Sequence, residues 1–262
     1  MIDYADANRK AWDHESEQGN IWTDGCTPKE IEAARKGDVH CILTPFKEVP
    51  PSWLGDLREK KILCLASGGG QQGVLLSAAG AQVTVFDISE KQIAQDKKIA
   101  ELENLPLKTI QGDMRDLSRF PDEAFDLIYN PTSTCFIDDV ISVYAQCNRI
   151  LKTGGYLLTS AINPILYMFE EQAEKKGKLK IKYTIPYSDP KSLSRKQLEK
   201  HLQKYDTIEF SHTLESLLGG LCENGFSITG MYSDSSGCEI LDSFVHDCFL
   251  AIKAKKNTQT TF

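Results

Sequence analysis

One segment constrains the fold more than any other: an apolar run, a glycine-rich turn, a helical pattern and a second strand-like run that ends in an aspartate. Residues 62–66 (ILCLA) lead into three consecutive glycines at 68–70, and apolar positions across 74–79 suit a helix packed on a sheet. Residues 81–86 (AQVTVF) are rich in β-branched residues and are followed by Asp87. Two strands joined by a helix of this length form a parallel unit with a right-handed crossover. The chain should therefore build on an open parallel sheet.

The same alternation continues to about residue 164. Ser89 and Gln92 have the spacing of a capping box and predict a helix that ends near Asn104. Strands are expected at 107–111, 125–129 and 156–162, with a helix at 140–151 that the glycines at 154 and 155 interrupt. Strands that alternate with helices in this way indicate a doubly wound α/β fold with helices on both faces of the sheet.

The last part of the chain does not continue this alternation of strands and helices. Helices are predicted at 165–176, 194–205 and 214–224, followed by strands at 226–232 and 244–254. The segment between these two strands is too short for a helical crossover, so they should pair antiparallel. We therefore divide the chain into a helical lid or leader (1–58), a cofactor-binding core (59–164), an insertion with closing helix and strands of the same domain (165–256), and a polar tail (257–262).

Composition excludes several classes of protein. The 262 residues carry a net charge of −7, which argues against a surface built to grip nucleic acid, and the lysines at 175–182 are expected on a solvated surface. No apolar run approaches the roughly 20 residues of a membrane helix, and the start of the chain lacks the pattern of a secretion signal. The eight cysteines show no zinc-ligand spacing. We expect a cytoplasmic protein with reduced thiols, no metal site and no membrane partner.

The glycine turn also carries chemistry. Gly68, Gly70 and Gly73 form the pattern G-x-G-x-x-G between a strand and a helix, and Asp87 follows Gly68 by 19 residues. Glycines let the backbone approach a ligand, the helix N-terminus favours an anionic group, and the carboxylate can accept hydrogen bonds from ribose hydroxyls. This arrangement predicts a nucleotide cofactor but leaves both a dinucleotide and S-adenosylmethionine open.

Segments further along favour S-adenosylmethionine. Gly112, Asp113 and Met114 follow the third strand, where a carboxylate can accept from an adenine amino group and a thioether can pack on the adenine face. Asn130 follows the fourth strand, over the reactive end of a cofactor. An antiparallel final pair of strands is also not expected of an ordinary dinucleotide fold.

Residues 60–164 resemble the class I S-adenosylmethionine-dependent methyltransferases. The resemblance rests on LCLASGGGQQG (63–73), VFDIS (85–89), GDMRDLS (112–118), FDLIYNPTSTCF (125–136) and RILKTGGYLL (149–158), in the order the family shows. More narrowly, LCLASGGGQQ, NPTSTCF, INPILY, NRKAWD (8–13) and SHTLESLLGGLCENGF (211–226) resemble a bacterial subgroup of methyltransferases whose substrate the resemblance does not supply.

The resemblance implies a mainly parallel seven-stranded sheet with an antiparallel last strand, and it implies roles for particular residues. Asp87 would hold both ribose hydroxyls. The other implied or candidate cofactor-binding residues are Ala66, Ser67, Gly68 and Gly70 at the amino-acid end, Ile88, Gln92, Gly112, Asp113 and Met114 around the base and ribose, and Asn130 through its backbone carbonyl.

This sequence departs from the family pattern at the amino-acid end of the cofactor. Cys64 stands where an acidic residue is usual, and Ala66 replaces the first glycine of the loop. The amino group of the methionine moiety must then find another partner, such as a backbone carbonyl or a residue of the N-terminal stretch.

Methyl transfer from a sulfonium is an in-line displacement, for which a protein supplies mainly alignment and electrostatics. No catalytic triad is expected, and a general base is needed only where the acceptor must lose a proton. The acceptor should approach beyond the fourth strand. The candidates to contact it are Trp12 from the leader, Ser133 and Cys135 after that strand, and Tyr183 and Tyr187 in the insertion.

The sequence therefore predicts an S-adenosylmethionine-dependent methyltransferase that acts on a small molecule and releases S-adenosylhomocysteine. A methyltransferase acting on RNA or protein is the first alternative and would need a basic surface near the carboxyl edge of the sheet. A dinucleotide-dependent oxidoreductase and a cofactor-binding protein without catalysis are weaker alternatives. Monomer and homodimer both stay open.

Overall fold

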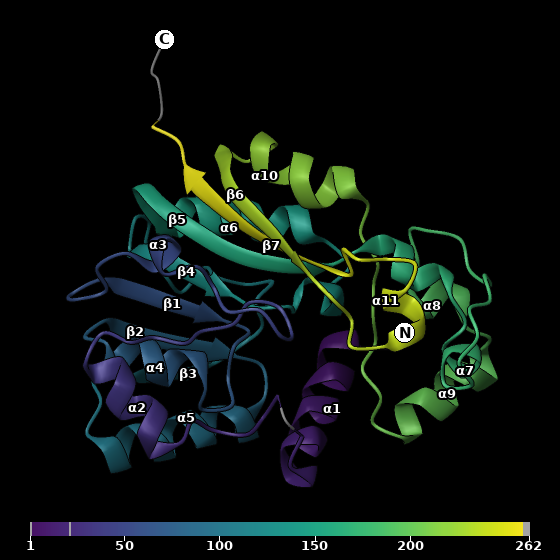
Figure 1. The fold of residues 1–262 in the computed structure, drawn as a ribbon, viewed down its shortest axis with the longest axis horizontal. Coiled ribbons are helices and arrows are strands. Elements are labelled where there is room, and N and C mark those ends of the chain that lie inside the picture. The colour runs from purple at the N-terminus through teal and green to yellow at the C-terminus, as the bar shows by residue number, and fades with distance from the viewer. Residues whose placement is uncertain (1, 21, 259–262) are drawn as a thin grey trace.

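The computed structural model describes residues 2–20 and 22–258, which form a seven-stranded sheet in the order β3-β2-β1-β4-β5-β7-β6 (Figure 1). The strands β1 to β5 pair in parallel, and β7 lies antiparallel between β5 and β6. This confirms the predicted doubly wound fold with an inserted antiparallel strand. The strands are β1 Lys61–Leu65, β2 Gln82–Asp87, β3 Lys108–Gln111, β4 Phe125–Asn130, β5 Leu151–Ile162, β6 Phe226–Asp234 and β7 Phe249–Lys256.

Helices cover both faces of the sheet and extend beyond its carboxyl edge. The α-helices are α1 Tyr4–Gln18, α2 Pro28–Arg35, α3 Pro51–Leu54, α4 Gln72–Ala78, α5 Glu90–Glu103, α6 Val140–Ile150, α7 Glu171–Glu174, α8 Asp189–Ser192, α9 Arg195–Gln203, α10 Gly220–Glu223 and α11 Glu239–Asp242. Short turns of other helix types are η1 Thr134–Phe136, η2 Pro164–Met168 and η3 Glu215–Gly219. No described helix is both long enough and apolar enough to cross a membrane.

Side-chain caps explain why two helices begin where the sequence predicts. The Ser194 hydroxyl accepts from the backbone N–H of Gln197, whose side chain accepts from the Ser194 backbone N–H, so a complete capping box begins α9. The Ser89 hydroxyl accepts from the backbone N–H of Gln92, but the return bond of a capping box is not formed there. Helix α5 ends at Asn104, which adopts a left-handed conformation with φ of 53°.

The structure corrects two predicted elements and the type of a third. The helix predicted at 165–176 is divided into η2 and α7, because Phe169 pairs with Ile181 between them. The helix predicted at 214–224 begins as a π-helical turn, η3. The strand predicted from residue 244 begins only at Phe249. The Asp242 carboxylate accepts hydrogen bonds from Ser236 and Gly237, and this local network replaces strand pairing before residue 249.

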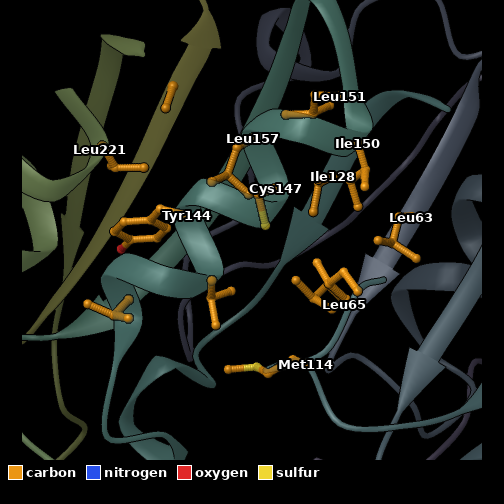
Figure 2. Packing of buried hydrophobic residues seen from close by; sticks show 14 of the residues in the cluster. Leu63, Leu65, Met114, Ile128, Tyr144, Cys147, Ile150, Leu151, Leu157 and Leu221 are labelled. Carbon is orange, nitrogen blue, oxygen red and sulfur yellow. The ribbon is translucent and has the colours of Figure 1, made fainter. Parts of the chain in front are cut away.

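Alternation along β1 divides the core into two layers. Ile62 and Cys64 pack on one face with residues of α2, α3 and α4, whereas Leu63 and Leu65 pack on the other. Figure 2 shows this second layer, where Tyr144, Cys147 and Ile150 of α6 lie over the sheet together with Leu221 of α10. Burial on both faces explains why β1 reads as a continuous apolar run.

Helix α1 and the insertion (residues 163–213) lie beyond the carboxyl ends of β1 and β2; Figure 1 shows α1 at the lower centre and the helices of the insertion on the right. The buried Asn8 side chain fixes α1 there: its amide donates to the carbonyls of Phe136 (3.1 Å) and Ile208 (3.0 Å), and its oxygen accepts from the Ile208 N–H (2.6 Å). One asparagine thus joins the leader to η1 and to the insertion. The division of the chain at residues 58, 164 and 256 stays a prediction.

Candidate functional site

A cavity of about 290 Å³ lies at the carboxyl edge of the sheet, beneath α1. Its walls come from the glycine loop, the ends of β2, β3 and β4, the segment 42–45 and helix α1. The sequence-predicted cofactor residues in its lining are Ala66, Ser67, Gly68, Asp87, Ile88, Gln92, Gly112, Asp113 and Met114. Segments far apart in sequence, from Ala5 of α1 to Phe249 of β7, therefore meet at one place, as the order of the strands requires.

Asp87 is buried and already held by backbone donors. Its Oδ2 accepts from the Gly68 N–H (2.9 Å) and its Oδ1 from the Ser89 N–H (2.9 Å). Burial raises the pKa of this carboxyl, while the backbone hydrogen bonds act in the opposite direction. Each oxygen keeps a further lone pair. The carboxylate is thus oriented before any ligand arrives and retains acceptor capacity for a pair of hydroxyls.

Gly68 must be glycine because the loop passes very close to the start of α5. A Cβ at this position would lie 2.8 Å from the Cβ of Gln92 and 3.2 Å from the Cβ of Asp87. The contact would push the loop away from the carboxylate that it helps to orient. The glycine therefore serves the geometry of Asp87 as well as access for a ligand.

A second buried carboxyl, Asp96 of α5, holds the same loop from behind and was missed by the sequence interpretation. The Gly69 N–H donates to Asp96 Oδ2 at 2.8 Å. Burial raises the pKa of Asp96 to about 7. The pattern that could have revealed it is an acidic residue four positions after Gln92, on the buried face of α5.

Cys64 and Ala66, where the sequence departs from the family pattern, have different surroundings. Cys64 is fully buried within the core, and burial raises its thiol pKa well above the usual value. Ala66 lines the cavity with φ of 47°. Ile42, Leu43, Thr44 and Pro45 also line the cavity, and the Ile42 N–H donates to Gln72 Oε1 at 3.0 Å. Part of the N-terminal stretch thus lies against the loop.

Asp113, which the sequence predicts beside the adenine of the cofactor, is paired with Arg115. Asp113 accepts from the Arg115 backbone N–H (2.9 Å) and from its guanidinium (2.6 Å). Met114 lies next to Ser133, with the hydroxyl 3.9 Å from its sulfur. Asp113 therefore shares its acceptor capacity between Arg115 and any adenine amino group.

Two predicted cofactor residues do not line this cavity. The Gly70 carbonyl accepts from the Cys26 N–H (2.8 Å), which ties the glycine loop to the N-terminal stretch. The Asn130 amide donates to the Leu65 carbonyl (2.9 Å) and to Ser133 Oγ (2.7 Å), and its oxygen accepts from Thr159 Oγ1 (2.8 Å). Asn130 braces the ends of β1, β4 and β5, and its backbone role stays a prediction.

A larger cavity of about 840 Å³ lies beside the first, between α1 and the insertion. Trp12 lines both cavities and packs edge-to-face on Phe136 at 5.4 Å. Tyr183 and Tyr187 line the larger one. Ser133 and Cys135 line the smaller one, and burial raises the Cys135 thiol pKa well above its usual value. The structure thus divides the acceptor candidates between two adjoining spaces.

Glu209 also lines both cavities, and the sequence interpretation did not single it out. It stands between Ile208 and Phe210, which are buried in a small cluster with Leu198. An acidic residue between two apolar ones is typical of a solvent-facing strand position. Nothing local in the sequence indicates that this carboxyl faces a cavity.

The lysine-rich stretch is paired with glutamates. Lys175 pairs with Glu171 (2.5 Å), and Lys180 and Lys182 pair with Glu170 (2.9 and 2.8 Å). Much of its charge is therefore balanced within the insertion. Within residues 2–20 and 22–258, no group of three or more His, Cys, Asp or Glu side chains is placed to hold a metal ion.

Comparisons with known proteins place this geometry in a family. Residues 63–159 match the family described as a methyltransferase domain. The chain is 44% identical to the uncharacterized methyltransferase YbaJ of Bacillus subtilis, over 91% of this chain and 93% of the relative.

Solved structures show the same fold at low sequence identity. An S-adenosylmethionine-dependent methyltransferase from Mesorhizobium loti aligns with a TM-score of 0.59 at 18% identity, over 78% of this chain and 94% of that one. Geranyl diphosphate C-methyltransferase from Streptomyces coelicolor, solved with S-adenosyl-L-homocysteine, aligns with a TM-score of 0.55 at 14% identity, over 78% and 77%. The chain belongs to the class I S-adenosylmethionine-dependent methyltransferases.

Proposed function

We propose that this protein transfers the methyl group of S-adenosylmethionine to a small-molecule acceptor. The observation that carries the proposal is the pair of adjoining cavities beneath α1 and the insertion. The smaller is lined by the glycine loop and Asp87, and the larger by aromatic side chains together with many charged residues, most of them from the insertion. The first suits the methyl donor, and the second suits an acceptor small enough to fit between α1 and the insertion.

The residues of the smaller cavity fit the methyl donor. Asp87 would accept from both ribose hydroxyls, Ile88 and Met114 would pack on the adenine, and Ala66, Ser67 and Gly68 would border the methionine end. Among the described residues of the lining, those charged at neutral pH are Asp87, Asp113, Arg115 and Glu209, and Arg115 is already paired with Asp113. The remaining acidic character favours a cationic ligand. When bound, S-adenosylmethionine supplies an electrophilic methyl group and a neutral thioether as leaving group.

Cys64 stands where the family usually has an acidic residue, so the methionine amino group needs another partner. The segment 42–45 is a candidate to supply it. It lines the same cavity as the glycine loop and is anchored through Gln72 to α4. The Leu43 carbonyl is already engaged, since it accepts from the Ser160 hydroxyl at 2.6 Å. The carbonyls on either side of Leu43 are therefore the better partners for the methionine amino group.

The protein's contribution to the reaction is alignment. Asp87 and the glycine loop would fix one end of the donor, while Trp12, Phe136 and the insertion tyrosines would restrict the acceptor to one approach. Positioning of this kind accounts for roughly 7–11 kcal/mol of a barrier in well-oriented reactions. Helix α1, fixed by Asn8, would limit the access of water to the cavities.

The alternative of an RNA or protein substrate finds less support. It needs a basic surface near the carboxyl edge, and the lysines of residues 175–182 include three that are paired with Glu170 or Glu171. The net charge of −7 also argues against a nucleic-acid substrate. The dinucleotide-dependent oxidoreductase, which the glycine motif left open, is excluded by the family assignment.

The narrower resemblance to a bacterial subgroup is supported by the relative from Bacillus subtilis, which is similar across the lid and insertion as well as the core. Because the regions that we expect to select the acceptor are included, we infer that the two proteins share an acceptor class.

Calorimetric titration tests the proposal. We expect S-adenosylmethionine and S-adenosylhomocysteine to bind and NAD not to bind. The Asp87→Ala variant should lose about 1.5–3 kcal/mol of binding free energy, the scale of hydrogen bonds to a charged group.

The matched control for this variant is Asp56→Ala, which removes an exposed aspartate that pairs with Arg58. It should bind like the wild type. Tight NAD binding without binding of S-adenosylmethionine would refute the proposed function, and unchanged affinity in a folded Asp87→Ala variant would refute the role of Asp87.

A further inference from the structure

The two cavities share a small set of lining residues, and these mark their junction. They are Trp12 of α1, Phe136 of η1, Ile162 at the end of β5, Glu209 of the insertion and Phe249 at the start of β7. Ile162 and Phe249 are paired across the sheet. Among the described residues that line both cavities, Glu209 alone is ionisable. A single carboxylate therefore stands in an otherwise apolar junction.

The Glu209 carboxylate is held on the insertion side by hydroxyl donors. Tyr167 Oη donates to Glu209 Oε2 at 2.7 Å, and Thr207 Oγ1 donates to Oε1 at 3.3 Å. These two bonds leave lone pairs on both oxygens. The carboxylate thus keeps acceptor capacity for a group in the junction.

Asp189 holds the backbone of Glu209 in place. Its Oδ2 accepts from the Glu209 N–H at 2.7 Å, and its Oδ1 accepts from the Tyr187 hydroxyl at 2.6 Å. Asp189 is buried, and the Tyr187 ring stacks on Tyr167 with centroids 5.5 Å apart. The donors and the backbone of Glu209 therefore belong to one packed unit.

Several titratable groups surround Glu209. They are Tyr167 of η2, Tyr187 just before α8, Asp189 of α8, His201 of α9 and Cys135 of η1. The pKa of the Glu209 carboxyl is raised, mainly by burial and also by the negative charge of Asp189. The hydrogen bond from Tyr167 and the charge of His201 act in the opposite direction but do not reverse the shift. A carboxyl shifted upward is a better proton acceptor near neutral pH than an ordinary glutamate.

We propose that Glu209 is the general base of the methyl transfer: it faces the transferred methyl group across the junction and takes the proton of the acceptor's nucleophile. This inference rests on the proposed function, because it requires the methyl donor in the smaller cavity and the acceptor in the larger one. The acceptor it implies carries an O–H or N–H group whose proton leaves during the transfer.

The step balances without a further reactant. A bond forms between the acceptor's oxygen or nitrogen and the methyl carbon, and the carbon–sulfur bond breaks with its electron pair passing to sulfur. The acceptor's proton passes to the Glu209 carboxylate. A sulfonium cation and a carboxylate anion thus become a neutral thioether and a neutral carboxylic acid.

Sinefungin tests the position of Glu209 without knowledge of the acceptor. In this analogue a carbon that bears an amino group replaces the methylated sulfur, so its ammonium points where the methyl group would be. If Glu209 faces that position, the wild type should bind sinefungin about tenfold or more tightly than S-adenosylhomocysteine at pH 8, because the two charges pair.

The Glu209→Gln variant should lose that preference while its affinity for S-adenosylhomocysteine changes less than about twofold, since the amide oxygen still accepts from Tyr167. The control Glu199→Gln removes an exposed glutamate of α9 that pairs with Arg195, and it should keep the preference. Equal preference in the wild type and Glu209→Gln would overturn the proposal.

The wild type provides a test that needs no variant. Its preference for sinefungin should fall as the pH is lowered through the pKa of Glu209, because the protonated carboxyl no longer pairs with the ammonium. A preference that is absent at pH 8, or that does not change on acidification, would overturn the role of Glu209. Failure of both compounds to bind at pH 8 would instead refute the proposed function.

Discussion

Asp96 is a buried carboxyl that supports the glycine loop without reaching the cavity, and its ionisation should be visible in the protein's stability. Its pKa is raised from 3.8 in the unfolded chain to about 7 in the fold. Between these values the folded state binds more protons than the unfolded state, so this residue's contribution to the free energy of unfolding falls as pH rises.

The variant Asp96→Asn cannot titrate at this position. From pH 5.5 to 8.5, the wild type should lose about 2 kcal/mol of unfolding free energy relative to the variant. Urea unfolding of the two cofactor-free proteins at each pH measures this difference, in which most other titrations cancel. A difference that does not change with pH would show that Asp96 is ionised throughout.

At the scale of single residues, the sequence predicts the role of a site residue only where a local sequence pattern marks that residue. Asp87 could be predicted because it ends a strand at a fixed distance from the glycine loop. Glu209 and Asp96 could not, because their roles depend on how the insertion and α5 pack. Gly70 follows the motif in the sequence, yet its carbonyl binds Cys26 and it does not line the cavity.

At the scale of elements, Asn8 makes three of the hydrogen bonds that attach α1 to η1 and to the insertion. The Asn8→Ala variant should lose about 1–3 kcal/mol of unfolding free energy, because buried backbone groups of Ile208 and the part-buried carbonyl of Phe136 lose their partner. The Ile208 amide should also exchange with solvent faster, which hydrogen-exchange measurements resolve at this residue.

Helix α1 offers a control for that prediction. Lys10→Ala removes an exposed side chain that pairs with Asp6 one turn away. It should leave both the stability and the exchange of Ile208 within a few tenths of a kcal/mol of the wild type. If Asn8→Ala behaves in the same way, α1 is held mainly by its other contacts.

Elements with a strong local pattern could be predicted, and those governed by side-chain networks could not. The core strands and helices from β1 to α6 lie within a few residues of the predicted bounds, since their apolar periodicity matches their burial. The segment 244–248 has the composition of a strand, but the polar turn around Asp242 and Ser236 occupies its neighbourhood. The hydrogen bonds of this loop therefore set the start of β7 at Phe249.

At the scale of the whole molecule, the reactivity of each cysteine thiol should follow its burial in the fold. All eight cysteines are free, and only Cys222 is exposed; Cys26 and Cys238 are partly buried. Ellman's reagent should therefore modify Cys222 rapidly, Cys26 and Cys238 more slowly, and the other five only on unfolding. In guanidinium without reductant, all eight should react. A smaller number would indicate a disulfide.

The position of β7 between β5 and β6 has a consequence for synthesis. β6 leaves the ribosome before β7, yet it has no place beside β5, because β7 belongs between them. Until residues 249–256 appear, the nascent sheet has an open edge at β5, a ready site for wrong pairing. The arrival of β7 closes it, and its final residue, Lys256, donates to the Leu151 carbonyl at 2.7 Å. The sheet is completed from the inside, by the strand that is made last.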